Sequence, residues 1–175
     1  PLLCAAVGGH GGCVEALLAA GCSPLEQADR AGNTPLLCAC AYGSAEAAEV
    51  LVRRGADCTV ANDDGATPLM LAAKIGSIMD GGDSASTVRA LLVHGNQDLQ
   101  AVDSAGMTAF HWACNYGNVA MLRELVRAGC DTTVRPSGVD LAWSSGHGKE
   151  VQAELRKLKD QKKAHKLAQE VQALL

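Results

Sequence analysis

GNTPLLCACAYG, residues 32–43, and GATPLMLAAKIG, residues 65–76, are two versions of one phrase placed 33 residues apart. A third version, GMTAFHWACNYG, occupies residues 106–117. The chain opens on the related PLLCAAVGGH, and a more divergent copy, SGVDLAWSSGH, begins at Ser137. Because self-similarity at this period is the signature of a repeat protein, we expect about five copies of one structural unit.

A second helical stretch follows each of the first four phrases and ends at a glycine. The stretches are VEALLAAG, AEVLVRRG, VRALLVHG and MLRELVRAG, and their glycines are Gly21, Gly55, Gly95 and Gly129. A glycine after a helical pattern predicts the end of the helix. Asp29, Asn62 and Asp103 each stand three residues before the glycine that opens a phrase, which predicts a turn. The unit therefore consists of a turn and two helices.

The helix starts are also specified locally. Thr34, Thr67 and Thr108 stand where an N-cap hydroxyl is favoured, and Pro35 and Pro68 follow at the first helical position. One pair of short helices cannot bury its apolar stripe alone, whereas stacked pairs share a continuous core. The pattern therefore predicts a solenoid.

These phrases resemble the ankyrin family, whose unit reads roughly D-x-x-G-x-T-P-L-H-x-A-A-x-x-G-H followed by an outer helix. The resemblance covers essentially residues 1–158. It implies an all-α fold with short β-turn fingers, a solenoid of about five helix-turn-helix repeats and a C-terminal helical extension. We place the repeats and the tail or cap at residues 1–28, 29–61, 62–101, 102–134, 135–158 and 159–175.

Two repeats depart from the pattern. The third gains seven residues around Ser77–Asp83, which we interpret as a tolerated surface loop or as a contact site for a partner. Its two aspartates are too few to hold calcium. The last repeat has a finger about four residues short, as expected of a terminal repeat. Because Pro1 falls inside a phrase, we expect the sequence to be part of a longer chain.

The C-terminal segment, residues 149–175, contains no Gly or Pro and carries seven Lys or Arg against four Asp or Glu. The segment therefore has a net charge of +3. Because the whole chain has a net charge of −4, residues 1–148 carry −7. One long helix is expected, with an apolar stripe at Val151, Leu155 and Leu158. A second apolar stripe comprises Ala164, Leu167, Val171 and Leu174, and it lies on a different face of the helix. The change of face occurs around Lys162 and Lys163, where we expect either a kink or the point at which the helix leaves the array. This second stripe either caps the last repeat or acts as a coiled-coil or partner helix.

The sequence gives no support to catalysis or to metal binding. The eight cysteines follow the repeat register, so we expect reduced core fillers, Cys4 among them. His10, His111 and His147 also match family positions, where the resemblance implies a structural role. No phosphate-binding glycine loop is present. Trp112 is expected to lie mainly in the core. We therefore predict a protein without enzymatic activity, cofactor or metal.

The family's variable positions define the candidate binding surface. They are the finger tips and the two residues that follow A-A on each inner helix, which line the concave face. Tyr42 and Tyr116, the only tyrosines, share one position with Ile75 between them, and we expect an apolar line or rings that merely cover the neighbouring backbone. The predicted partner-binding residues are Arg30, Asn33, Tyr42, Asp63, Asp64, Lys74, Ile75, Ser104, Met107, Asn115 and Tyr116.

The resemblance favours a non-catalytic module that binds a protein through its fingers and its concave face. Acidic fingers favour a basic or extended segment of the partner. We expect an intracellular and monomeric chain, located in the cytoplasm or, alternatively, in the nucleus, that binds neither nucleic acid nor membranes. The alternatives are a scaffold that associates through the C-terminal helix, and a regulatory, inhibitory domain of a larger protein.

Overall fold

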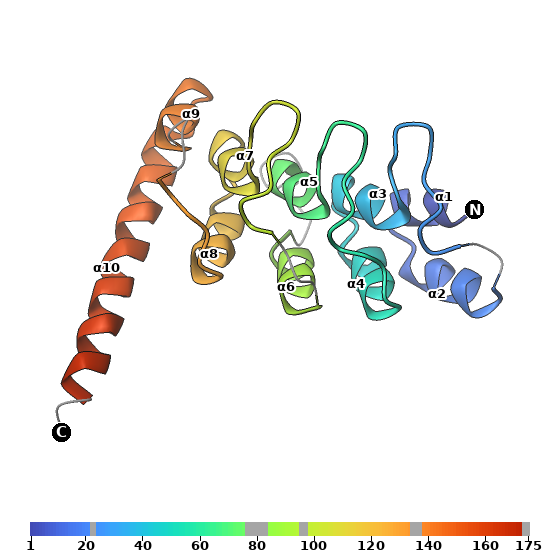
Figure 1. Cartoon of the computed structure of the whole chain (residues 1–175), viewed down its shortest axis with the longest axis horizontal. Coiled ribbons are helices and arrows are strands. Elements are labelled where there is room, and N and C mark those ends of the chain that lie inside the picture. The colour runs from blue at the N-terminus through green and yellow to red at the C-terminus, as the bar shows by residue number, and fades with distance from the viewer. Residues whose placement is uncertain (22–23, 76–83, 95–97, 134–137, 173–175) are drawn as a thin grey trace.

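The computed structural model describes residues 1–21, 24–75, 84–94, 98–133 and 138–172, with ten helices among them. The first helix of each repeat belongs to an inner layer: α1 (Leu2–Val7), α3 (Pro35–Ala41), α5 (Pro68–Ile75), α7 (Ala109–Asn115) and α9 (Gly138–Ser144). The second helix belongs to an outer layer: α2 (Gly11–Ala19), α4 (Ala45–Arg53), α6 (Ser84–His94), α8 (Val119–Arg127) and α10 (Gly148–Gln172). Figure 1 shows the two layers side by side, with the fingers projecting beyond the inner helices. The predicted solenoid is confirmed.

The predicted helix starts are confirmed at the level of single hydrogen bonds. The hydroxyls of Thr34, Thr67 and Thr108 each accept a hydrogen bond from the amide N–H three residues later. Pro35 and Pro68 are the first residues of α3 and α5. At the other end of the unit, the glycines after the outer helices α4 and α8 have φ values of 90° and 92°, which residues with a Cβ rarely adopt.

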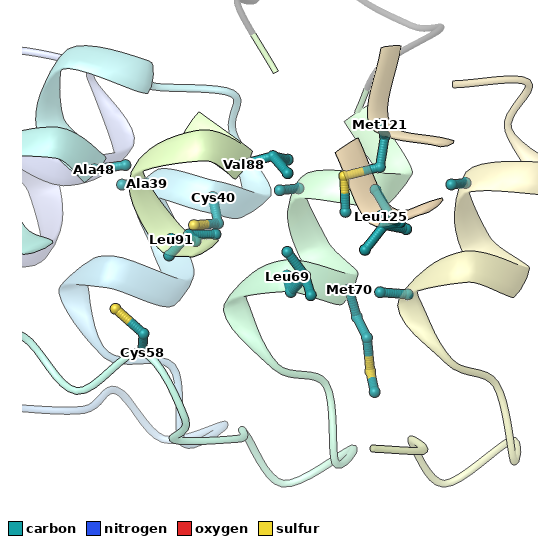
Figure 2. Close-up of a cluster of buried hydrophobic side chains, with 14 of the residues drawn as sticks. Ala39, Cys40, Ala48, Cys58, Leu69, Met70, Val88, Leu91, Met121 and Leu125 are labelled. Atoms are coloured by element: carbon teal, nitrogen blue, oxygen red, sulfur yellow. The ribbon is translucent and has the colours of Figure 1, made fainter. Parts of the chain in front are cut away.

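The core runs as one body between the two layers. Each inner helix packs against the next inner helix, and each outer helix packs against the next outer helix. Figure 2 shows part of this core, where side chains from several repeats meet, including Leu69 and Met70 of α5 and Met121 and Leu125 of α8. These four side chains are at most 1% exposed. No repeat has a core of its own, as expected of a solenoid.

Among the described residues, a side chain at the start of the outer helix ties three of the repeats to the preceding inner helix. Ser44, Asn118 and His147 occupy equivalent positions, and their polar atoms bond the main-chain oxygens of Val7, Ala73 and Asn115. These contacts confirm the structural role expected of His147. The fourth member of this set, His10, is exposed and forms no such bond within the described chain, because it belongs to the first described repeat.

The long C-terminal helix is confirmed, since α10 runs from Gly148 to Gln172 and continues beyond α8 in Figure 1. Val151, Leu155 and Leu158 are buried against the array, as the first stripe predicts. Residues 159–162 are exposed, so the buried stripe of the described side chains ends at Leu158. The side chains of the second stripe and the insertion at 77–83 lie outside the described residues.

An ion pair fastens α10 to α8. The Glu154 carboxylate is 7% exposed and accepts a hydrogen bond from the Arg123 guanidinium of α8. That bond, together with the charge of Arg123, holds the pKa of Glu154 below its ordinary value. The contact therefore stabilises the docked helix only while the carboxylate is ionised.

Replacing Glu154 by Gln should lower the free energy of unfolding at pH 7 by about 1 kcal/mol, the order of a charge-assisted hydrogen bond to a half-exposed partner. Because the folded pKa is lowered, this contribution is present above the unfolded pKa and is lost as the pH falls through the folded pKa. Urea unfolding of both chains from neutral to acidic pH measures the difference. Asp160→Asn, at an exposed position of α10, removes the same charge as a control. A difference that persists in acid would contradict the assignment.

Candidate functional site

The fingers are rigid because an acceptor at the base of each one holds the main chain of the tip. The Asp29 carboxylate accepts hydrogen bonds from the amides of Ala31 and Asn33, both at 2.9 Å. Hydrogen bonds from Asn33, from its side chain first and then from its amide, hold the pKa of Asp29 below its ordinary value. Asn62 and Asp103 make the equivalent pair of bonds in the next two fingers. The turns predicted from these residues are therefore confirmed.

Neighbouring fingers are also bonded to each other. The amide of Asp63 donates to the main-chain oxygen of Ala31 at 3.1 Å, and the amide of Ser104 donates to that of Asp64 at 2.8 Å. The Asn62 side chain donates to Asn33 Oδ1 at 2.9 Å. Three successive fingers thus form one continuous edge. The sequence did not predict these bonds between fingers, because they join main-chain atoms and depend on no particular side chain.

The predicted finger residues fall into two groups. Arg30, Asp63, Asp64 and Ser104 are exposed, so their side chains are accessible along the finger edge. The Asn33 side chain, in contrast, is half-buried and bonds Asp29 and Asn62. Asn33 therefore braces the fingers, and its polar atoms are already engaged. Met107 is half-buried at the foot of the third of these fingers.

The predicted inner-helix residues follow the stack of α3, α5 and α7. Tyr42 is 57% exposed at the end of α3, whereas Ile75 and Tyr116 are half-buried at the equivalent positions. Ile75 Cγ2 lies 2.9 Å from the point that a Cβ on Gly43 would occupy. This contact places Ile75 directly beside the residue that follows Tyr42. We name the surface formed by these three residues, Lys74 and Asn115 the inner surface.

Trp112 packs against the core, as expected from the sequence, and it also reaches this surface. The indole is half-buried and packs against the core on one side. The Lys74 ammonium lies 3.9 Å from the centroid of the Trp112 ring. The centroids of the Trp112 and Tyr116 rings are 5.9 Å apart, and the two ring planes are inclined at 31°. Contacts of both kinds stabilise an aromatic side chain that is only partly buried. Trp112 is therefore part of the inner surface as well as of its support.

Asp103 fixes the orientation of this tryptophan. Trp112 Nε1 donates to Asp103 Oδ2 at 2.7 Å, while the other carboxylate oxygen holds the finger. Asp103 is 9% exposed, so it connects the finger from below the surface to the pair of rings of Trp112 and Tyr116, which we call the aromatic cluster. The position of Asp103 three residues before Gly106 predicted the hydrogen bonds within the finger. It did not predict the hydrogen bond to Trp112.

Five cysteines and His111 lie in the buried interior of the described chain. Cys38, Cys40, Cys58, Cys114 and Cys130 are buried, reduced cysteines. Burial raises the pKa of Cys114 to about 12 and that of Cys130 to about 11, which keeps both protonated at neutral pH. His111 is buried, and its Nδ1 accepts a hydrogen bond from the Thr108 amide, which completes a capping box.

Cys4 and Cys13 correct the expectation that the cysteines fill the core, because both are exposed. They lie on the first two helices, whereas Cys38, the equivalent of Cys4, is covered by the repeat before it. Within the described residues, no group of three or more His, Cys, Asp or Glu side chains could hold a metal ion. No helix in that part of the chain is long and apolar enough to cross a membrane.

Comparison with known proteins gives a family for this architecture. The model of ankyrin repeats (3 copies) matches residues 1–62 and 54–136. The human neurogenic locus notch homolog protein 1 is 32% identical over 107 residues, which is 59% of this chain, and its Xenopus laevis counterpart is 34% identical over 100 residues, or 57% of it. Human notch homolog protein 2 is 32% identical over 104 residues. The chain spans only 4% of the length of each of these relatives. The family model covers most of the sequence, and the turn, cap and stacking contacts agree with it, so this chain belongs to the ankyrin-repeat family.

Proposed function

We propose that this chain binds an extended segment of a protein partner along its inner surface and finger edge, without catalysis. Ankyrin repeats are generally protein–protein interaction modules, and repeat arrays offer long binding faces. The observation that carries the proposal is the ordered row of Tyr42, Ile75 and Tyr116, with Trp112 held beside it. Aromatic side chains fixed before binding cost little entropy when a partner arrives.

The charge of the finger edge supports a particular kind of segment. Asp63 and Asp64 are exposed next to each other at one finger tip, and neither forms an ion pair with a described residue. Residues 1–148 carry a net charge of −7. A partner segment with basic residues facing this edge would therefore associate faster at low ionic strength. We propose an intracellular setting for this interaction, in keeping with the buried reduced thiols.

The double variant Tyr42→Ala, Tyr116→Ala should weaken binding of the partner by at least about tenfold, because exposed aromatic anchors dominate such interfaces. The melting temperature should fall only slightly, since Tyr42 is 57% exposed and Tyr116 is only half-buried. Isothermal titration with a segment isolated by affinity to the wild-type chain, together with calorimetric melting, measures both quantities.

A matched control uses an exposed apolar side chain away from the inner surface. Val93→Ala on the outer helix α6 removes a side chain that is 77% exposed and should leave the affinity unchanged. If the tyrosine double variant keeps both its melting temperature and its affinity, the inner surface is not the binding site.

A further inference from the structure

Lys74 stands out among the residues of the inner layer. It is the only Lys or Arg in the sequences of α1, α3, α5, α7 and α9. Its ammonium is held over the Trp112 ring at 3.9 Å, and the side chain is half-buried. Among the described residues no carboxylate lies within ion-pair distance of it. The inner surface therefore presents one positioned positive charge that nothing in the described chain neutralises.

Asn115 occupies on α7 the position that Lys74 occupies on the adjacent α5. Its side chain is half-buried and forms no hydrogen bond with any other described residue. The three other described asparagines, in contrast, all use their side chains: Asn33 and Asn62 in the fingers and Asn118 at a helix start. Two neighbouring inner helices thus each present an unused hydrogen-bond donor at the same place in the repeat.

We propose that Lys74 and Asn115 bind the carboxylate of an Asp or Glu side chain in the partner segment, an inference that rests on the proposed function. A carboxylate has only acceptors to offer, which match the ammonium and the amide N–H groups. The bond to the ammonium is charge-assisted, and the Trp112 ring, which packs against Tyr116, covers one side of the ammonium.

The alternative is that a cation of the partner stacks on Trp112. Such a cation would have to displace Lys74 or approach it against charge repulsion, because Lys74 already covers the ring. The observations favour the anion. Basic residues of the same segment would face Asp63 and Asp64 at the finger edge, so the recognised segment carries both signs of charge in separate places.

A random dodecapeptide library displayed on phage provides the probe, panned against the immobilised wild-type chain at low salt. We expect the selected peptides to share an acidic residue. Its replacement by the corresponding amide should weaken binding to the wild-type chain about tenfold and binding to the Lys74→Met chain less than about twofold. Lys74→Met keeps an apolar stem on Trp112, and Lys74→Gln serves as a second, polar variant. Lys74→Arg should restore the dependence on the acidic residue.

Arg53→Met is the charge control, because Arg53 is exposed on the outer helix α4 and the variant changes the net charge equally. It should behave as the wild type. Three outcomes would each overturn the inference. The selected peptides could lack an acidic residue, or replacing that residue by its amide could weaken binding to the Lys74→Met chain as much as to the wild type. The third outcome is a set of peptides whose Arg or Lys makes them bind the Lys74→Met chain more tightly than the wild type. If the peptides also bind the Tyr42→Ala, Tyr116→Ala double variant as tightly as the wild type, the proposed function is overturned as well. If the double variant loses binding, only the carboxylate site is overturned.

Discussion

Phe110→Ala should lower the free energy of unfolding by about 3–5 kcal/mol, the range for truncating a buried aromatic side chain. Phe110 is the only phenylalanine in the chain and is 2% exposed at the centre of the fourth repeat. A Cβ on Gly138 would come within 2.7 Å of its Cε1 atom, so the ring supports α9 as well as its own repeat. Because each repeat is stabilised by its neighbours, the cavity should also loosen α9 and α10. Urea unfolding followed by circular dichroism measures the loss.

Phe110→Leu is the matched control for this prediction. Leu36 and Leu69 occupy the equivalent position in earlier repeats and are at most 1% exposed there. The leucine variant should therefore cost less than about 1.5 kcal/mol, as volume-conserving core changes usually do. It should also relieve part of the clash that Gly138→Ala would create. A loss below about 1 kcal/mol in Phe110→Ala would show that the ring does not fill the space between α7 and α9.

The sequence predicted those features that are settled within one repeat. The hydroxyl of Thr34 needs only the amide three residues later, and Asp29 needs only the amides of its own turn, so local spacing was sufficient. The absence of Gly and Pro was likewise enough to predict the length of α10. The periodicity then fixed the stacking, because every repeat buries the same face.

Contacts between side chains of different repeats could not be predicted in this way. Whether Lys74 extends over Trp112 depends on the rotamers of both side chains and on the distance between α5 and α7. The spacing of residues in the sequence determines neither of these. Trp112 was expected mainly in the core because Cys38 and Leu71 stand at its position in other repeats. An indole is too large to be buried there completely, so its ring reaches the surface. Cys4 is exposed for a different reason: the described chain places no repeat before it.

Asp103→Ala should lower the free energy of unfolding by roughly 2–4 kcal/mol, because three donors lose their acceptor in a nearly buried place. Those donors are the amides of Ala105 and Met107, both at 3.0 Å, and Trp112 Nε1 at 2.7 Å. The finger and the aromatic cluster should loosen together. Urea unfolding gives the stability, and tryptophan fluorescence in a Trp143→Phe background reports on Trp112 alone.

Asp103→Asn separates the two roles of this carboxylate, and the third repeat shows why. Asn62 holds its finger through Oδ1, at 3.1 Å from the Asp64 amide and 2.9 Å from the Ala66 amide. An asparagine at 103 can do the same, but its amide N–H₂ would then face the indole N–H, donor against donor. We expect a smaller loss of stability, about 1–2 kcal/mol, with the fluorescence change of the alanine variant retained. A finger as unstable in Asp103→Asn as in Asp103→Ala, or an unchanged indole signal, would show that Asp103 does not orient Trp112. If the indole does move, Lys74 loses its support, and the carboxylate dependence proposed for the inner surface should weaken with it.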